Sequence, residues 1–66
     1  MQIQVNGELV EFADEATLMD LITKLALEGK RYAIEVNEEI VARSEHAIYS
    51  LSAGDQIEVV QAIGGG

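Results

Sequence analysis

The sequence contains no cysteine, no proline and no tryptophan, and only four of its 66 residues are basic. Without cysteine the chain can form no disulfide, no thiolate metal site and no catalytic thiol of its own. No stretch approaches the roughly 18 consecutive apolar residues of a membrane helix. The first residues also lack the charged and apolar regions of a signal peptide. We therefore expect a cytoplasmic protein.

The charge balance is strongly acidic. Twelve acidic residues against four basic ones give a formal net charge of -8. This charge repels the phosphate backbone of nucleic acids and anionic membrane surfaces, so neither is an expected partner. It favours solubility, and it would also speed the encounter with a basic patch on another protein.

Residues that could support catalysis or bind a metal are sparse. His46 is the only histidine, and we expect it at the surface without a catalytic role. Ser44, Ser50 and Ser52 lie nearby in the sequence, but no base and orienting acid accompany them. The acidic pairs at 14–15 and 38–39 lack the ligand spacing of a calcium loop. The sequence therefore predicts a protein that is not an enzyme and that holds no metal or cofactor.

Alternating apolar residues predict five strands. Residues 1–6 and 8–12 alternate with a period of two, and the Asn6-Gly7 pair between them is typical of a two-residue hairpin. This pattern directs Val10 and Phe12 toward the core and Leu9 toward solvent. Residues 32–37, the short edge pair 40–41 and residues 56–63 predict the remaining strands, the last entered through a turn at 53–55.

One helix is expected between the second and third strands. Thr17 and Asp20 form a variant capping box at its start, and Gly29 is the expected C-terminal stop. The apolar residues at helical spacing are predicted to lie in the core: Leu18, Leu21, Ile22 and Leu25.

Residues 42–52 have no sustained period, and we expect a loop there with a helical turn near 47–49, anchored by Ile48 and Leu51. The complete order is strand, strand, helix, strand, strand, strand. One helix can cover one face of the sheet, so the order predicts a two-layer α+β domain. We assign residues 1–63 to this domain and residues 64–66 to a flexible C-terminal tail.

The tail, Gly64 to Gly66, follows directly on the last predicted strand. An arm without Cβ atoms can pass through a channel too narrow for any side chain. An α-carboxyl group has an ordinary pKa of about 3.3 to 3.7, so it is ionised at neutral pH and is a poor acyl donor until activated. A partner that binds ATP and magnesium could convert it to an acyl adenylate. A frayed terminus or a remnant of cloning is the alternative interpretation.

The chain resembles the ubiquitin-like, β-grasp sulfur carriers, and most closely the ThiS family of thiamine biosynthesis. The resemblance rests on the opening at 1–7, the helix at Thr17, the runs 36–41 and 54–60, and the Gly65-Gly66 end, in this order and spacing. It covers the whole chain. Family members often carry a proline and then an arginine after the Ile-Val pair, where this chain has Ala42 before Arg43.

The resemblance implies a mixed β-grasp sheet of four to five strands and a chemistry at Gly66. A ThiF-type, E1-like adenylyltransferase would adenylate the Gly66 carboxylate with ATP and magnesium. A sulfur donor such as a cysteine desulfurase or a rhodanese-like protein would then supply the sulfur of a thiocarboxylate. That sulfur would pass to a ThiG-type thiazole synthase. Gly64 and Gly65 would thread the partner's channel, beside a docking face formed by Leu9, Val60, Ala62 and Ile63.

Three other functions are compatible with the same residues. The closest is a MoaD-type small subunit of molybdopterin synthase, which resembles this chain in fold, tail and sulfur chemistry. A ubiquitin-like protein modifier or binding module would instead form an amide with a lysine or no bond at all. A structural domain would need no reactive tail.

Overall fold

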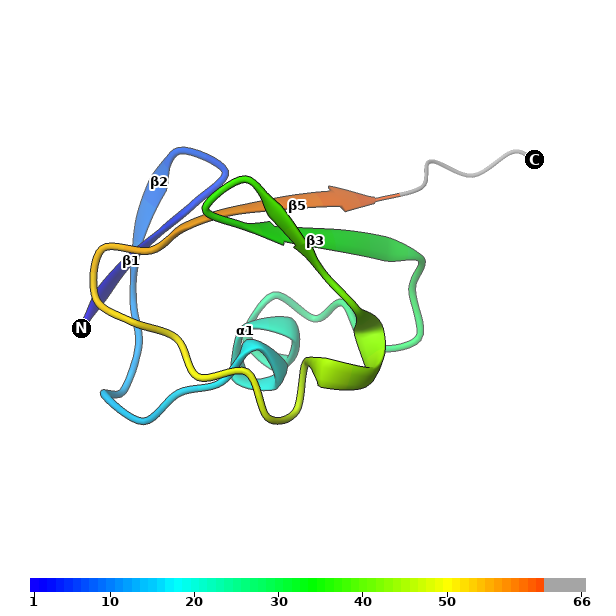
Figure 1. Ribbon diagram of the computed structural model, residues 1–66, viewed down its shortest axis with the longest axis horizontal. Coiled ribbons are helices and arrows are strands. Elements are labelled where there is room, and N and C mark those ends of the chain that lie inside the picture. The colour runs from blue at the N-terminus through cyan, green and yellow to red at the C-terminus, as the bar shows by residue number, and fades with distance from the viewer. Residues whose placement is uncertain (62–66) are drawn as a thin grey trace.

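The computed structural model describes residues 1–61, which form a five-stranded mixed sheet with a single helix on one face (Figure 1). Along the chain the elements are β1 (Gln2–Val5), β2 (Glu8–Glu11), α1 (Leu18–Lys24), β3 (Tyr32–Val36), β4 (Glu39–Val41), the 3-10 turn η1 (Arg43–Glu45) and β5 (Gln56–Gln61). The predicted α+β class and element order are confirmed.

The last strand lies in the middle of the sheet. The strand order is β2-β1-β5-β3-β4, in which β1 and β5 run parallel and the other neighbouring pairs run antiparallel. The predicted edge strand, β4, is at the edge. This topology is the expected β-grasp arrangement, and it means that the chain leaves the sheet from its centre.

Both hairpins turn through two residues with positive φ angles. Asn6 (φ 50°) and Gly7 (φ 85°) join β1 to β2, as the Asn-Gly pair predicts. Asn37 (φ 51°) and Glu38 (φ 73°) join β3 to β4 in the same way. The side-chain amide of Asn37 donates to Asp55 Oδ1 at 3.0 Å, and its oxygen accepts from the Gln56 amide at 3.0 Å. These bonds tie the second turn to the start of β5.

The core lies between α1 and the inner face of the sheet. The three central strands contribute alternate residues to it, as a period of two requires, and the outer strands β2 and β4 add the partly buried Val10 and Val41. The buried apolar side chains are Ile3, Val5, Phe12, Ala16, Leu18, Leu21, Ile22, Leu27, Ile34, Val36, Leu51 and Ile57. In a chain this short a single cluster of this kind provides most of the stability.

The helix starts where predicted and ends earlier than predicted. At its start the Asp20 carboxylate accepts the Thr17 backbone N–H at 2.8 Å. The predicted stop at Gly29 is wrong, because α1 ends at Lys24 and Ala26 takes the left-handed conformation (φ 56°). The Leu27 amide donates back to the Ile22 carbonyl at 3.0 Å and the Ala26 amide to Thr23 at 3.1 Å, which is a Schellman motif.

This early ending exchanges one leucine for another in the core. Leu25 was predicted to be buried, but it is 37% exposed, whereas Leu27 is 4% exposed. The left-handed residue reverses the chain and turns Leu27 under the helix. The helical period alone could not indicate this, because the reversal falls between the two leucines.

The connection between β4 and β5 also differs in detail from the expectation. Its helical turn is η1 at Arg43–Glu45 rather than at 47–49. Ile48 is 75% exposed and anchors nothing, while Leu51 is buried as predicted. Backbone hydrogen bonds to the start of α1 and the residues before it hold this connection instead. The Leu18 amide donates to the Tyr49 carbonyl, and the Leu51 amide donates to the Ala16 carbonyl.

Candidate functional site

The candidate site begins at the end of β5, where the described part of the chain stops. The predicted site residues beyond it, Ala62, Ile63, Gly64, Gly65 and Gly66, lie outside the described residues. The structure describes the strand that precedes them, β5. Gln61 is the last residue of β5 and pairs with Tyr32 at the start of β3.

The C-terminal half of β5 is held differently on its two sides. Toward β3 it pairs continuously from Ile57 to Gln61, but β1 pairs only with Gln56 and Ile57. Beyond that point the side chain of Asn6 takes the place of a strand. Its oxygen accepts the Val59 amide at 2.8 Å and its nitrogen donates to the Val59 carbonyl at 3.5 Å. The end of β5 is therefore fixed to the sheet as far as its last described residues.

An aromatic cluster lies beneath this end of the sheet. The ring of Tyr32 stacks with that of His46, with centroids 5.9 Å apart and planes at 22°. The Arg43 guanidinium carbon lies 4.5 Å from the Tyr32 ring centroid, within the range of a cation–π contact. Since Tyr32 pairs with Gln61, this stack lies close to the last described residue of β5.

The prediction that His46 lies at the surface is wrong. His46 is only 2% exposed, and its Nε2 lies 3.0 Å from the Val41 carbonyl oxygen. A carbonyl only accepts, so Nε2 carries the proton and donates it. Nδ1 is buried without a hydrogen-bond partner among residues 1–61. The exposed neighbours Glu45 and Ala47 gave no apolar period from which this burial could be predicted.

Catalytic groups do not assemble around this histidine. Ser44, Ser50 and Ser52 are exposed, and the His46 Nε2 is engaged with a main-chain carbonyl. Within residues 1–61 no group of three or more histidine, aspartate or glutamate side chains could hold a metal ion. No helix in the same range is long and apolar enough to cross a membrane.

The face of the sheet opposite α1, which we call the outer face, carries exposed apolar residues. Leu9 on β2 is 65% exposed, Val60 on β5 is 60% exposed, and Ile40 on β4 is 73% exposed. Leu9 and Val60 were proposed for docking, and both point to this face as their strand positions predict. Ile40 was not included, although its parity on β4 indicates the same face.

The sheet register separates the two predicted docking residues. Leu9 pairs with Gln4, which in turn pairs with Gln56, so Leu9 lies level with the start of β5. Val60 lies four residues further along and pairs with Ala33. At about 3.3 Å per residue and 4.8 Å per strand, the two positions are roughly 16 Å apart. Val60 therefore lies beside the end of β5, and Leu9 does not.

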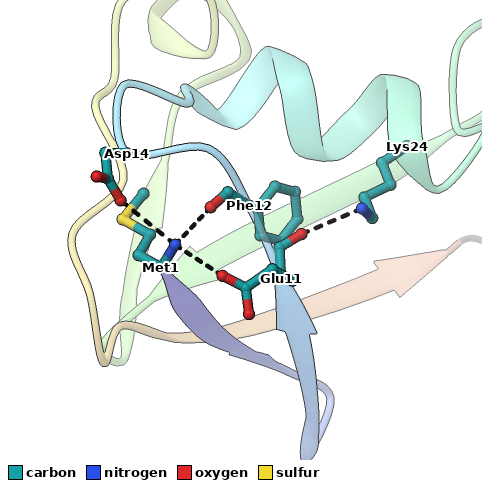
Figure 2. Close-up of polar contacts among 5 residues, drawn as sticks. All are labelled: Met1, Glu11, Phe12, Asp14 and Lys24. Atoms are coloured by element: carbon teal, nitrogen blue, oxygen red, sulfur yellow. Dashed lines mark hydrogen bonds and ion pairs between the residues drawn. The ribbon is translucent and has the colours of Figure 1, made fainter.

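A cluster of charged groups surrounds the N-terminus (Figure 2), at the opposite end of the molecule from the end of β5 (Figure 1). The Met1 amine contacts Glu11 Oε2 at 2.9 Å, the Phe12 carbonyl at 2.6 Å and Asp14 Oδ1 at 3.4 Å. The hydrogen bond to Glu11 raises the pKa of this amine above its ordinary value of 8.0, with a smaller contribution from Asp14. Burial opposes the shift only in part.

Lys24, the last residue of α1, contacts the same region. Its Nζ donates to the Glu11 carbonyl at 3.1 Å and lies 5.2 Å from the centroid of the Phe12 ring. Beside it is an open depression of about 770 Å³ lined in part by Phe12, Ala16 and Thr23. These contacts join β2 to α1. They are remote from the end of β5, so we assign them to the stability of the fold.

The comparisons with known proteins agree with this geometry. The model of the ThiS family matches residues 3–66. Sulfur carrier protein ThiS of Bacillus subtilis is 35% identical over 65 residues, covering 97% of this chain and 98% of that protein.

The chain belongs to the ThiS family.

A solved ThiS-family structure has the same fold. The crystal structure of thiamine biosynthesis protein ThiS from Geobacter metallireducens superposes with a TM-score of 0.82 at 25% identity, over the full length of both chains. This match confirms the predicted β-grasp fold and its similarity to ThiS carriers. The sulfur-carrier function predicted from the sequence agrees with the names of these relatives.

The family also extends into larger proteins. A thiazole synthase of Paramagnetospirillum magneticum is 36% identical over 66 residues, which is all of this chain and 20% of that protein. The chain thus spans about a fifth of the length of the thiazole synthases it matches. A ThiS-like segment therefore occurs within proteins named for thiazole synthesis.

Proposed function

We propose that this protein is the sulfur carrier of thiamine biosynthesis and that Gly66 is its reacting residue. The observation that carries the proposal is the match of the whole chain to ThiS carriers, together with a central strand, β5, that ends five residues before Gly66. The body supplies a rigid, recognisable base and the tail supplies the acyl group.

The first chemical step is adenylation. An oxygen of the Gly66 carboxylate attacks the α-phosphorus of ATP and displaces pyrophosphate, with magnesium and cationic groups of the partner stabilising the charge on the phosphates. AMP is then the leaving group that the free carboxylate lacked. In this proposal a partner performs the step. Its assignment to a partner is consistent with residues 1–61, in which no group of histidine, aspartate or glutamate side chains could hold a metal ion and His46 Nε2 contacts the Val41 carbonyl.

The second step is sulfur transfer. The terminal sulfur of a persulfide on a cysteine desulfurase or a rhodanese-like protein would attack the acyl carbon and release AMP, which gives an acyl disulfide at Gly66. A second thiol of the partner proteins would then cleave the S–S bond, leaving the thiocarboxylate at Gly66 and a disulfide between the two partner thiols. The carrier gives up this sulfur to thiazole synthase. Pairing with a ThiG-type thiazole synthase is supported by the ThiS-like segment within proteins of that name.

The reach of the tail defines the arrangement of carrier and partner. Five residues follow Gln61, and five extended residues span at most about 17 Å. The partner's reacting atoms must therefore lie within that distance of the end of β5. Gly64 and Gly65 would fill the narrow part of the channel, while Val60, Ala62 and Ile63 would contact the surface around its mouth. Leu9 would contact the partner only if the interface extended across the sheet.

Two of the three proteins compared above are named for thiazole or thiamine synthesis, which favours this pathway over the molybdopterin alternative. The cytoplasm, where ATP is available, is the compartment that the proposal requires.

Pyrophosphate release tests the proposal. Purified protein is incubated with ATP, magnesium and a ThiF-type adenylyltransferase from the same genome. We expect release that depends on the carrier, and no release from a variant lacking Gly65 and Gly66 whose circular dichroism spectrum is unchanged. Equal release by that variant, or stable amide conjugates to lysine in place of an adenylate, would contradict the proposal.

A further inference from the structure

Three of the four basic residues lie around the end of β5. Lys30 and Arg31 directly precede Tyr32, the residue that pairs with Gln61, and Arg43 lies over the Tyr32 ring. In Figure 1 the segment before β3, η1 and the end of β5 are all at the end of the molecule opposite the N-terminus. We call Lys30, Arg31 and Arg43 the basic rim.

The basic rim stands out against the charge of the rest of the chain. The segments that carry it, residues 27–32 and 42–48, contain only two of the twelve acidic residues, Glu28 and Glu45. Within residues 1–61, ion pairs shorter than 4.0 Å involve only the Met1 amine. The three cations of the rim are exposed and pair with no carboxylate in that range. They are therefore available to an external anion.

The position of Arg43 is built into the fold. Its guanidinium rests on Tyr32, and Tyr32 rests on a buried His46 held by the Val41 carbonyl. A cation seated on an aromatic ring loses less side-chain freedom on binding than one that moves freely in solvent. The same stack explains why a histidine is buried here without any catalytic function.

We propose that the basic rim binds carboxylate side chains of the activating enzyme at the mouth of the channel that receives the tail. This inference rests on the proposed function. The alternative anion is the phosphate of the nucleotide, which reacts at Gly66. For an extended tail that phosphate would lie about 17 Å from Gln61, farther than an arginine side chain reaches, so we favour carboxylates of the partner beside the end of β5.

The basic rim would also orient the acidic carrier as it approaches the partner. With a net charge of -8, the body is repelled by an acidic surface in most orientations. Only the end that carries the rim is attracted, and that end presents the tail. Such charge complementarity affects the rate and specificity of association more than the chemistry that follows.

Paired charge variants separate this local effect from a change in net charge. Arg43→Gln is compared with Lys24→Gln, since each removes one positive charge, and Lys30→Gln/Arg31→Gln is compared with Lys24→Glu, since each shifts the net charge by two. The readout is pyrophosphate release by the ThiF-type enzyme at increasing carrier concentration and at two salt concentrations. Circular dichroism and urea unfolding establish that each variant is folded.

For Arg43→Gln we expect KM to rise roughly 5-fold, and for the double variant to rise by more, with kcat unchanged and a weaker dependence on salt. The Lys24 variants should change KM less than about 2-fold. Equal KM changes in the rim and Lys24 variants, or a loss of kcat with constant KM, would overturn the inference and leave the proposed function intact. No pyrophosphate release from the wild-type protein would overturn both.

Discussion

The two faces of the sheet use the same residue types for different purposes. On the inner face Ile3, Ile34 and Ile57 are at most 1% exposed and pack under α1. On the outer face Ile40 and Val60 are 73% and 60% exposed. Burying an apolar side chain stabilises the folded state, whereas an exposed side chain adds little, so the outer residues contribute little to the free energy of folding. The difference shows that the inner face provides the buried core, while apolar residues of the outer face stay exposed.

The largest expected effect tests this division with one substitution on each face. Ile34→Ala removes a fully buried side chain and should lower the free energy of unfolding by about 2 to 5 kcal/mol. Ile40→Ala, on the adjacent strand but on the outer face, should change it by less than about 0.5 kcal/mol. Urea unfolding followed by circular dichroism measures both. Similar losses in the two variants would mean that the faces do not differ in this way.

A second pair of variants divides the outer face itself. Val60→Gln should raise the KM for adenylation about 10-fold, because Val60 lies beside the end of β5 where a central contact is worth more than 1 kcal/mol. Leu9→Gln, about 16 Å away, should raise it less than half as much. Both proteins should unfold at the wild-type urea concentration. A larger effect at Leu9 would move the docking surface to the β2 side of the sheet.

The helix side can be made more stable without touching the outer face. Ala26 has a left-handed backbone conformation that glycine adopts without strain, so Ala26→Gly should stabilise the protein by about 1 kcal/mol. Gly29 also has a positive φ of 78°, and Gly29→Ala should destabilise it by a similar amount. Thermal unfolding measures the two shifts, and adenylation kinetics should be the same for both. A loss of stability in Ala26→Gly would contradict the left-handed conformation at the end of α1.

The smallest expected effect depends on pH at the Met1 amine. Its hydrogen bond to Glu11 raises its pKa in the folded state above the ordinary 8.0. The bond therefore stabilises the fold fully below pH 8.0 and is lost as the pH rises through the folded pKa. Urea midpoints of the wild type should fall over that interval, and Glu11→Gln should reduce the fall. Glu8→Gln, which lacks the contact, serves as the control and should behave as the wild type does.

Most of the fold could be predicted because its signals are local. Strand alternation, the Asn6-Gly7 turn and the Thr17–Asp20 box each depend on neighbours in the sequence. The errors arose where tertiary contacts decide. Ala26 adopts a left-handed conformation, against the preference of alanine, because the reversal buries Leu27, and no periodicity indicates that exchange.

The candidate site could be predicted only in part. The Gly64–Gly66 sequence and the strand parity of Val60 pointed to one end of β5, where the structure places Val60. The basic rim could not be found in this way. Lys30 and Arg31 are far in sequence from Arg43, and only the pairing of Tyr32 with Gln61 and the burial of His46 bring the three to the base of the tail.

The central claim is that Gly66 carries the reacting carboxylate, and the intact mass of the protein purified from its native cell tests it directly. A fraction of the molecules should be heavier by the difference between one sulfur and one oxygen atom, with fragmentation placing the exchange at Gly66. That fraction should disappear when the gene of the ThiF-type enzyme is deleted. A protein with unmodified Gly66 under thiamine-limited growth, or one in which Gly66 is joined to a lysine, would contradict the account.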